Sequence, residues 1–276
     1  MFLPQLTFKS LPRRSLLQFA GLAVSAPAWS FASTADRGSA GGDAEKSPLG
    51  STFPTQAPEL VQEMVRVSHF DLKRVQQLVE AQPSLARAAW DWGFGDWETA
   101  LGAASHMGNR PIAGYLISKG ARPSLFSSAM LGHLDVVKAF VAAEPGVQRI
   151  RGPHSISLLA HAQAGGDAAR PVFEYLQSLG DAGADTPAPL LQKDIDAIVG
   201  EYPFGAGAND CVDVKAEKNN LMWTRRGTMG RPLFHLGDRV FYPWGAVAVR
   251  IGFSQQGSTT KMSVHDPDVV LTAVRK

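Results

Sequence analysis

The sequence of 276 residues contains one cysteine, Cys211, and this scarcity excludes two kinds of protein. A chain with one thiol forms neither an internal disulfide framework nor a zinc cluster of thiolates. The sequence also lacks an excess of one charge, because 27 basic residues stand against 25 acidic ones. A formal charge of +2 argues against a nucleic-acid partner that is bound through bulk positive charge.

Two further absences concern membranes and chemistry. After the N-terminal segment, no apolar run approaches the roughly 18 to 20 residues of a bilayer span, so we expect no stable membrane anchor. The sequence has no His-Glu-x-x-His pair, no phosphate-binding glycine loop and no nucleophile elbow. Ser258 and Lys261 have the spacing of a β-lactamase-type nucleophile, but they begin an expected strand where that family requires a helix. We therefore predict no catalytic residues, no cofactor and no enzymatic activity.

The N-terminus has the pattern of an export signal. Arg13 and Arg14 precede an uncharged stretch of moderate hydrophobicity, which ends in small residues near Ala28 and Ala32. That order is typical of a secretory signal peptide. The arginine pair resembles the twin-arginine export signal, which a receptor reads. We expect a signal peptide over residues 1–32, cleaved after Ala28 or Ala32, and a periplasmic or secreted protein; an organelle transit peptide or an uncleaved anchor is the alternative.

Two stretches rich in small residues, glycine and proline divide the rest of the chain. Residues 33–58 are rich in Ser, Gly, Ala, Thr and Pro, which predicts a flexible linker. Residues 182–189 (AGADTPAP) indicate a second hinge. We expect one domain over residues 59–185 and another over residues 186–276.

The segment 59–185 repeats an apolar pattern. A turn residue is followed by apolar residues five, eight and nine positions later, and these offsets share one face of a helix. A helix of smaller residues precedes three of these segments, so the pattern predicts stacked helix pairs. The turn residues that begin it are Phe70, Gly108, Gly132 and Asp167.

Two motifs in this segment resemble ankyrin repeats. Residues 99–104 (TALGAA) stand where that family has its Thr-Pro-Leu-His-x-Ala box, and residues 132–137 (GHLDVV) resemble the start of its second helix. The resemblance covers residues 59–185 and implies an α-solenoid of about four repeats that binds partners and performs no chemistry. The repeat spacings of 38, 24 and 35 residues depart from the family's period of about 33.

The longest spacing leaves a finger between residues 82 and 98 that is rich in aromatic side chains. Tryptophan is costly to expose and is enriched in interface hot spots, so this finger is a candidate binding element for a protein partner. The alternative is that the rings pack on the neighbouring repeat or on the C-terminal domain. The candidate residues are Trp90, Trp92, Phe94 and Trp97.

Four histidines fall near helix junctions of different repeats. Helices that pack on one another lie about 10 Å apart, whereas the ligands of one zinc ion all lie within about 2.1 Å of it. We therefore predict no metal site. The histidines are His69, His106, His133 and His161.

The C-terminal segment changes from helical periodicity to alternation. Val249, Ile251 and Phe253 alternate with polar or small residues, which predicts a strand over residues 246–253. Several such segments joined by short turns predict an antiparallel meander. Residues 200–202 (GEY) and the Val-Arg pair at 274–275 resemble the small lipocalin-like domain that trails many β-lactamase-like exported proteins. Because the catalytic domain of those proteins is absent, the resemblance does not imply hydrolysis.

Together these patterns predict an α+β fold with two domains, an ankyrin-like α-solenoid followed by a small antiparallel β barrel or meander. The expected function is that of an exported bacterial ankyrin-repeat protein that binds another protein. The alternative is a carrier of a small apolar ligand inside the C-terminal domain, and an unrecognised hydrolase is the least favoured class. The sequence sets neither the identity of the partner nor the oligomeric state.

Overall fold

The computed structural model describes residues 52–183, 185–217, 220–267 and 269–276. The chain divides into two units, Met1–Leu49 and Gly50–Lys276, and every described element belongs to the second. The predicted signal peptide with Arg13 and Arg14, and most of the predicted linker, lie outside the described residues. Among the helices that are described, none is both long enough and apolar enough to cross a bilayer.

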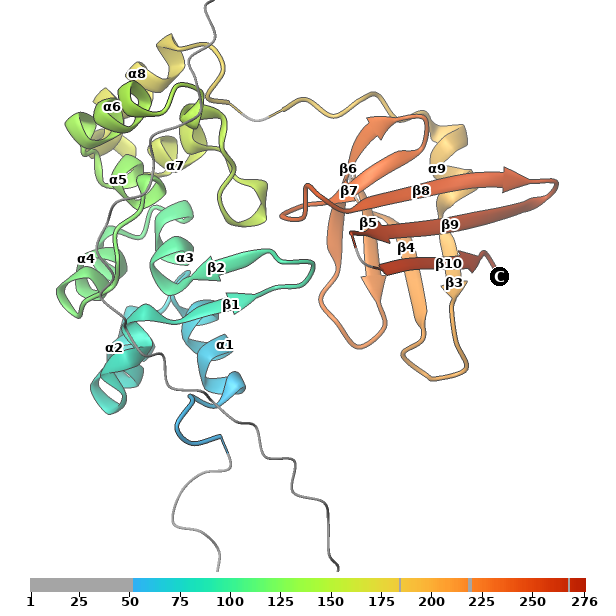
Figure 1. The fold of residues 1–276 in the computed structure, drawn as a ribbon, viewed down its shortest axis with the longest axis horizontal. Coiled ribbons are helices and arrows are strands. Elements are labelled where there is room, and N and C mark those ends of the chain that lie inside the picture. The colour runs from blue at the N-terminus through green and yellow to red at the C-terminus, as the bar shows by residue number, and fades with distance from the viewer. Residues whose placement is uncertain (1–51, 184, 218–219, 268) are drawn as a thin grey trace, which may run out of the picture. The chain divides into compact units, whose positions relative to one another are not determined.

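The N-terminal part of the described chain consists of helices that follow one another in pairs (Figure 1). Short connections join the two helices of each pair, and 3₁₀ turns or a β hairpin separate some of the pairs. The helices are α1 (Pro58–Val67), α2 (Leu72–Ala81), α3 (Ala100–His106), α4 (Arg110–Ser118), α5 (Leu125–Leu131), α6 (Leu134–Ala143), α7 (Leu158–Ala164) and α8 (Arg170–Ser178). The hairpin, β1 (Ala89–Asp91) and β2 (Trp97–Thr99), extends from this helical part between α2 and α3 (Figure 1).

Hydroxyl side chains determine where the small-residue helices begin. Thr99, Ser124 and Ser157 precede α3, α5 and α7, and each side-chain oxygen accepts a hydrogen bond from the backbone N–H three residues later. Such a cap satisfies a donor that the first helical turn leaves free. The cap on α3 also places Glu98, the residue before Thr99, beside the first turn of α3.

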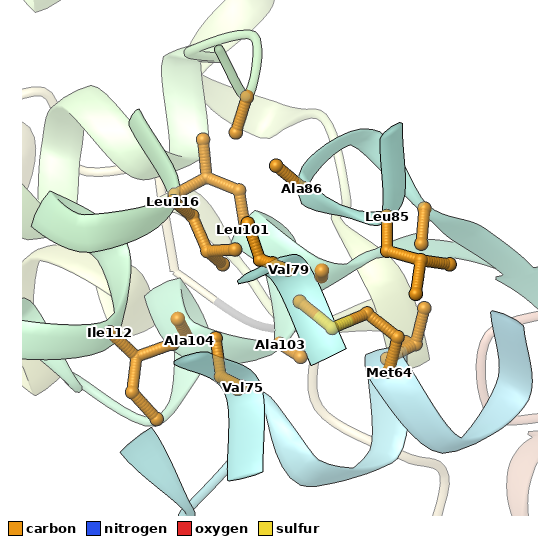
Figure 2. Packing of buried hydrophobic residues seen from close by; sticks show 14 of the residues in the cluster. Met64, Val75, Val79, Leu85, Ala86, Leu101, Ala103, Ala104, Ile112 and Leu116 are labelled. Atoms are coloured by element: carbon orange, nitrogen blue, oxygen red, sulfur yellow. The ribbon is translucent and has the colours of Figure 1, made fainter. Parts of the chain in front are cut away.

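Small side chains let the helices approach closely, and larger ones fill the space that remains. Ala100, Ala103 and Ala104 of α3 are fully buried, as are Val75 of α2 and Leu116 of α4. Figure 2 shows Val75 of α2, Ala103 and Ala104 of α3 and Leu116 of α4 among the side chains of this cluster. Burying a leucine of this kind stabilises the fold by about 2 kcal/mol. A second cluster, which includes Val137, Leu158, Val172 and Leu176, performs the same role under α5 to α8.

The C-terminal part contains one short helix and an eight-stranded antiparallel sheet. The helix is α9 (Gln192–Ile198), and its Ile198 is buried in the core of the sheet. The strand order is β10-β9-β8-β7-β6-β5-β4-β3. The strands are β3 (Gly200–Pro203), β4 (Cys211–Glu217), β5 (Asn220–Arg225), β6 (Arg231–Gly237), β7 (Val240–Pro243), β8 (Arg250–Gln256), β9 (Thr259–Asp266) and β10 (Val269–Val274).

The sheet is nearly closed, because its two edge strands lie beside each other. β3 and β10 are in contact, and the N–H of Lys276, just after β10, donates to the carbonyl oxygen of Glu201 in β3 at 2.9 Å. The interior is filled by the chain's own side chains, including the fully buried Tyr202 and Ile251. The sheet therefore resembles a barrel whose interior is packed.

The fold class predicted from the sequence was wrong. The C-terminal sheet has eight strands and is nearly closed, so it is larger than the predicted small barrel or meander. The edge strand β3 has little strand pattern in the sequence, because only four residues pair there and one of them is Pro203. The helices also do not form a clear ankyrin solenoid, because a hairpin and several 3₁₀ turns interrupt the described helix pairs at irregular intervals.

Candidate metal centre

Three histidines and one glutamate from separate parts of the helical segment meet in one cluster. His69 lies between α1 and α2, Glu98 lies in β2, His106 is the last residue of α3, and His154 lies in the 3₁₀ turn Pro153–Ser155. One ligand atom from each residue lies within 4.8 Å of those of the other three. We call this group the His–Glu centre.

The carboxylate of Glu98 is the middle of the His–Glu centre. Its side chain has no solvent exposure. The Nε2 atom of His106 lies 2.9 Å from Oε1, and the Nε2 atoms of His69 and His154 each lie 3.5 Å from Oε2. The indole Nε1–H of Trp92 donates to Oε2 at 2.7 Å. All three histidines thus present the same ring nitrogen to one carboxylate.

The other ring nitrogen of two histidines is held by an oxygen acceptor. The Nδ1 of His69 lies 3.0 Å from the carbonyl oxygen of Arg66 and 3.2 Å from that of Val65. The Nδ1 of His154 lies 2.8 Å from Oδ2 of Asp96. Carbonyl and carboxylate oxygens only accept hydrogen bonds, so these contacts place a proton on Nδ1 in both rings. In metal sites, histidine ligands are oriented by the same kind of contact.

The tautomer of His69 leaves a mismatch inside the cluster. Burial lowers the pKa of His69, although the charge of Glu98 opposes that effect. The ring is therefore neutral near pH 7, and with the proton on Nδ1 its Nε2 atom carries a lone pair. That lone pair faces the Glu98 carboxylate, which is itself an acceptor. Two acceptors that face each other repel, and either a proton or a metal cation between them removes that repulsion.

The remaining electrostatics show how much charge the centre concentrates. Burial alone would raise the pKa of Glu98, but hydrogen bonds from His106 and His154 lower it to about 2. Burial alone would lower the pKa of His154, but hydrogen bonds to Asp96 and Glu98 raise it to about 9. Near neutral pH the carboxylates of Glu98 and Asp96 therefore face the imidazolium ring of His154, and Asp96 also accepts a hydrogen bond from the guanidinium of Arg231 at 2.8 Å. The binding of a metal ion here would displace the Nε2 proton of His154.

A fourth imidazole lies beside the centre without joining it. The ring of His161 in α7 is fully buried, and its centroid lies 6.3 Å from that of His106. Its Nδ1 lies 2.9 Å from the carbonyl oxygen of Ser157, whereas its Nε2 has no hydrogen-bond partner within the described residues. Burial lowers the pKa of His161 to about 4, so this ring is neutral at physiological pH.

The donor set and spacing fit a zinc-type ion. Zinc binds histidine nitrogens and carboxylate oxygens in a tetrahedron, whose ligand atoms are about 3.4 Å apart when each lies about 2.1 Å from the metal. The 3.5 Å separations from Glu98 to His69 and His154 match that edge. The 2.9 Å contact with His106 is a direct hydrogen bond that the ion would replace.

The predicted aromatic finger divides between the interior and the surface. Trp90 and Trp92 are partly buried against the helical core, and Trp92 also donates to Glu98. Phe94 packs on Trp223 of β5, with ring centroids 5.4 Å apart. Trp97 is 65% exposed. Among the four predicted residues, Trp97 alone offers a large free surface.

The prediction of no metal site assumed that histidines of different helix pairs lie about 10 Å apart, whereas the ring centroids of His69 and His106 are 4.9 Å apart. Two ligands were also missed, because Glu98 lies in the finger and His154 lies in a turn outside the repeat pattern. His133, a further member of the predicted set, is exposed and lies outside the His–Glu centre. No local pattern in the sequence marks Glu98 or His154 as a ligand, because both lie outside the helical periodicity.

A cavity of about 370 Å³ adjoins the centre. His154 forms part of its wall, together with Arg151 and the aromatic side chains of Phe234, Tyr242 and Trp244. The His154 side chain is 26% exposed, compared with 0% for Glu98. The cavity therefore borders the centre at His154, the member whose side chain is 26% exposed.

No protein-family model matches the chain, and neither a curated protein nor a solved structure matches it. The resemblances to ankyrin repeats, to a twin-arginine signal and to a lipocalin-like domain therefore stay predictions, and the function is argued from the site.

Proposed function

We propose that this protein binds one divalent transition-metal ion of the zinc class through His69, Glu98, His106 and His154. The observation that carries the proposal is geometric: one ligand atom from each of the four residues lies within 4.8 Å of the other three, and Nε2 of His69 lies 3.5 Å from the buried Glu98 carboxylate. A cation between these atoms removes the repulsive contact and is bound by both of them, the Nε2 of His69 and a carboxylate oxygen of Glu98. Imidazole nitrogens suit zinc, copper, iron and nickel, and the carboxylate adds a hard oxygen donor.

The number of ligands favours a structural or regulatory role for the ion. Four protein donors complete a tetrahedral shell, whereas catalytic zinc sites keep one position open for water or substrate. The ligands come from α3, β2 and two connecting segments, so the ion would join parts of the chain that are separated by up to 85 positions. The proposal therefore includes no reaction.

The test is a metal titration of the chelator-stripped protein. Zinc is added in competition with a chromophoric chelator, and one equivalent is expected to bind with a dissociation constant in the micromolar range or tighter. His106→Ala removes one of the four ligands and should abolish stoichiometric binding, whereas the matched control His133→Ala should bind as the wild type does. Cobalt substitution should give the visible absorption of a four-coordinate ion. A wild-type protein that binds no zinc at micromolar concentration would overturn the proposal.

A second candidate function is the binding of another protein, as the ankyrin resemblance implies. Exposed apolar side chains support it, because Trp97 is 65% exposed, and Val136 and Phe140 of α6 are 41% and 45% exposed at positions one turn apart. Large apolar side chains at the surface are typical of interaction sites.

We further propose that the chain is exported by the twin-arginine route to the periplasm or beyond, because Arg13 and Arg14 precede an apolar stretch as in that class of signal.

The binding of a protein partner is tested by crosslinking in cells and purification of the tagged protein. Trp97→Ser and Phe140→Ser should each reduce the yield of one specific crosslinked species without a change in melting temperature, because neither ring is buried. Met229→Ser is the control, since Met229 is 58% exposed and lies in the sheet part, before β6. If neither Trp97→Ser nor Phe140→Ser reduces that yield, these two side chains do not bind the partner.

A further inference from the structure

The carboxylate of Asp96 connects the His–Glu centre to the sheet. Asp96 is 3% exposed and lies two residues before Glu98 on the hairpin. Its Oδ1 accepts a hydrogen bond from the backbone N–H of His154 at 2.9 Å, and its Oδ2 lies 2.8 Å from Nδ1 of the same histidine. The guanidinium Nη1 of Arg231 in β6 donates to Oδ2 at 2.8 Å. One carboxylate thus joins a proposed ligand to a buried arginine of the sheet.

Arg231 is held in place by the sheet itself. It is 6% exposed, and its Nη1 also donates to the carbonyl oxygen of Trp244 at 2.7 Å. Gly245 follows at φ +88°, and a Cβ atom at this position would collide with the Asp96 carboxylate. The N–H of Gly245 donates to Oγ of Ser155 at 2.8 Å. β6 and the segment after β7 therefore enclose Asp96 and the turn that carries His154.

The backbone of that turn needs such support. His154 has φ 57° and ψ 25°, and Ser155 has φ 58°, so two consecutive residues with side chains adopt the left-handed conformation. This conformation is unfavourable for residues other than glycine and persists where surrounding contacts hold it. Here the contacts are the Asp96 bond to the His154 N–H and the Gly245 bond to Ser155. The position of the His154 ring therefore depends on residues of the sheet.

We infer that Asp96 and Arg231 are positioning residues of the proposed metal centre, so that the C-terminal sheet sets the metal affinity without contributing a ligand. The inference rests on the proposed function. A carboxylate that accepts a hydrogen bond from the Nδ1–H of a ligating histidine fixes the tautomer of the ring. It also makes the Nε2 lone pair a stronger ligand for the metal. Arg231 acts one step further out, because its hydrogen bond to Oδ2 holds the Asp96 carboxylate in the position that faces His154. By linkage, metal binding strengthens the contact between the hairpin and β6 to the same extent.

The test compares zinc affinities of variants of the full chain by chelator competition. Asp96→Asn preserves the shape of the side chain and should weaken binding 10- to 100-fold while the stoichiometry stays at one. Arg231→Met should weaken binding about 10-fold, and Arg231→Lys, which keeps a charge, should weaken it less. Arg226→Met is the matched control, because Arg226 pairs with Glu201 and Asp213 in the same sheet and does not contact Asp96.

A double variant separates positioning from general loss of stability. If Arg231 acts through Asp96, Asp96→Asn combined with Arg231→Met should bind zinc no more weakly than Asp96→Asn alone. The cobalt spectrum should change in Asp96→Asn, because the basicity of a ligand changes, and should not change in Arg226→Met. Wild-type affinity in both Asp96→Asn and Arg231→Met, with binding abolished in His106→Ala, would overturn this inference and leave the proposed function intact. A wild-type protein that binds no zinc would overturn both.

Discussion

Glu98 shows what a single residue contributes to this centre. A carboxylate without solvent exposure is tolerated only where donors surround it, and here Trp92, His106 and His154 supply them. The same surroundings lower the pKa of Glu98 to about 2, so the charge persists at any physiological pH. A residue in this environment is an electrostatic anchor for the helical part, and the proposed function makes it a ligand as well.

The residue-scale prediction concerns stability in the absence of metal. In chelator-stripped protein, Glu98→Ala should lower the free energy of unfolding by about 3 kcal/mol, because it leaves the His154 charge without its second carboxylate. Urea denaturation followed by tryptophan fluorescence measures this change. Glu80→Ala, at an exposed position of α2, should stay within about 0.5 kcal/mol of the wild type. Equal effects for the two variants would mean that Glu98 is dispensable for the metal-free fold.

At the scale of elements, the ends of helices and strands build the centre. His106 ends α3, Glu98 lies one residue before Thr99, the N-cap of α3, and His69 lies between α1 and α2.

The close approach of helix pairs depends on glycines at the turns. Gly132 caps α5 at φ +80°, and a Cβ atom there would collide with the carbonyl oxygen of Ala168, before α8.

The element-scale prediction follows from that collision. Gly132→Ala should destabilise the protein by about 3 kcal/mol, because left-handed backbone strain adds to a backbone clash that cannot relax. Gly120→Ala is the matched control, since Gly120 has φ +89° with no atom within 4 Å of the added Cβ. It should cost about 1 kcal/mol from strain alone. Thermal unfolding of both variants measures the difference, and equal midpoints would show that the close approach is not required.

For the whole molecule, the sheet is joined to the helical part through buried polar contacts. Asp96, Arg231 and Ser155 form hydrogen bonds between segments that are more than 80 positions apart in the chain. Phe94 adds an apolar contact with Trp223. These contacts make the proposed metal centre depend on both the helical part and the sheet, although all four proposed ligands lie before residue 155.

The whole-molecule prediction concerns export. Arg13→Lys combined with Arg14→Lys keeps the positive charge but removes the planar guanidinium groups, so a receptor that reads the arginine pair should no longer export the chain. Full-length precursor should then accumulate in the cytoplasm, as measured by cell fractionation and N-terminal sequencing. The ordinary secretory route needs only charge and apolar length, so undiminished processing after Ala28 or Ala32 in the variant would contradict the twin-arginine route.

The sequence predicted local features well and their combination poorly. The apolar face that it assigned after Gly108 lies in α4, where Ile112, Ala113 and Leu116 are fully buried. The strand expected over residues 246–253 begins only at Arg250, because residues 246–249 form a turn. In this turn the N–H of Val249 donates a hydrogen bond to the carbonyl oxygen of Ala246. Helical and strand periodicity depend on neighbouring residues, so a single sequence reveals them, whereas the exact ends depend on packing.

The sequence by itself determined which segments become helices, where glycines and hydroxyl residues end or begin them, and which strands alternate. Only the tertiary structure decided that His69, Glu98, His106 and His154 meet, and that Asp96 lies between His154 and Arg231. The physical reason is that periodicity and capping act over a few residues. A buried group of charges, by contrast, depends on how helix ends, a hairpin and a sheet pack together, which no local pattern records.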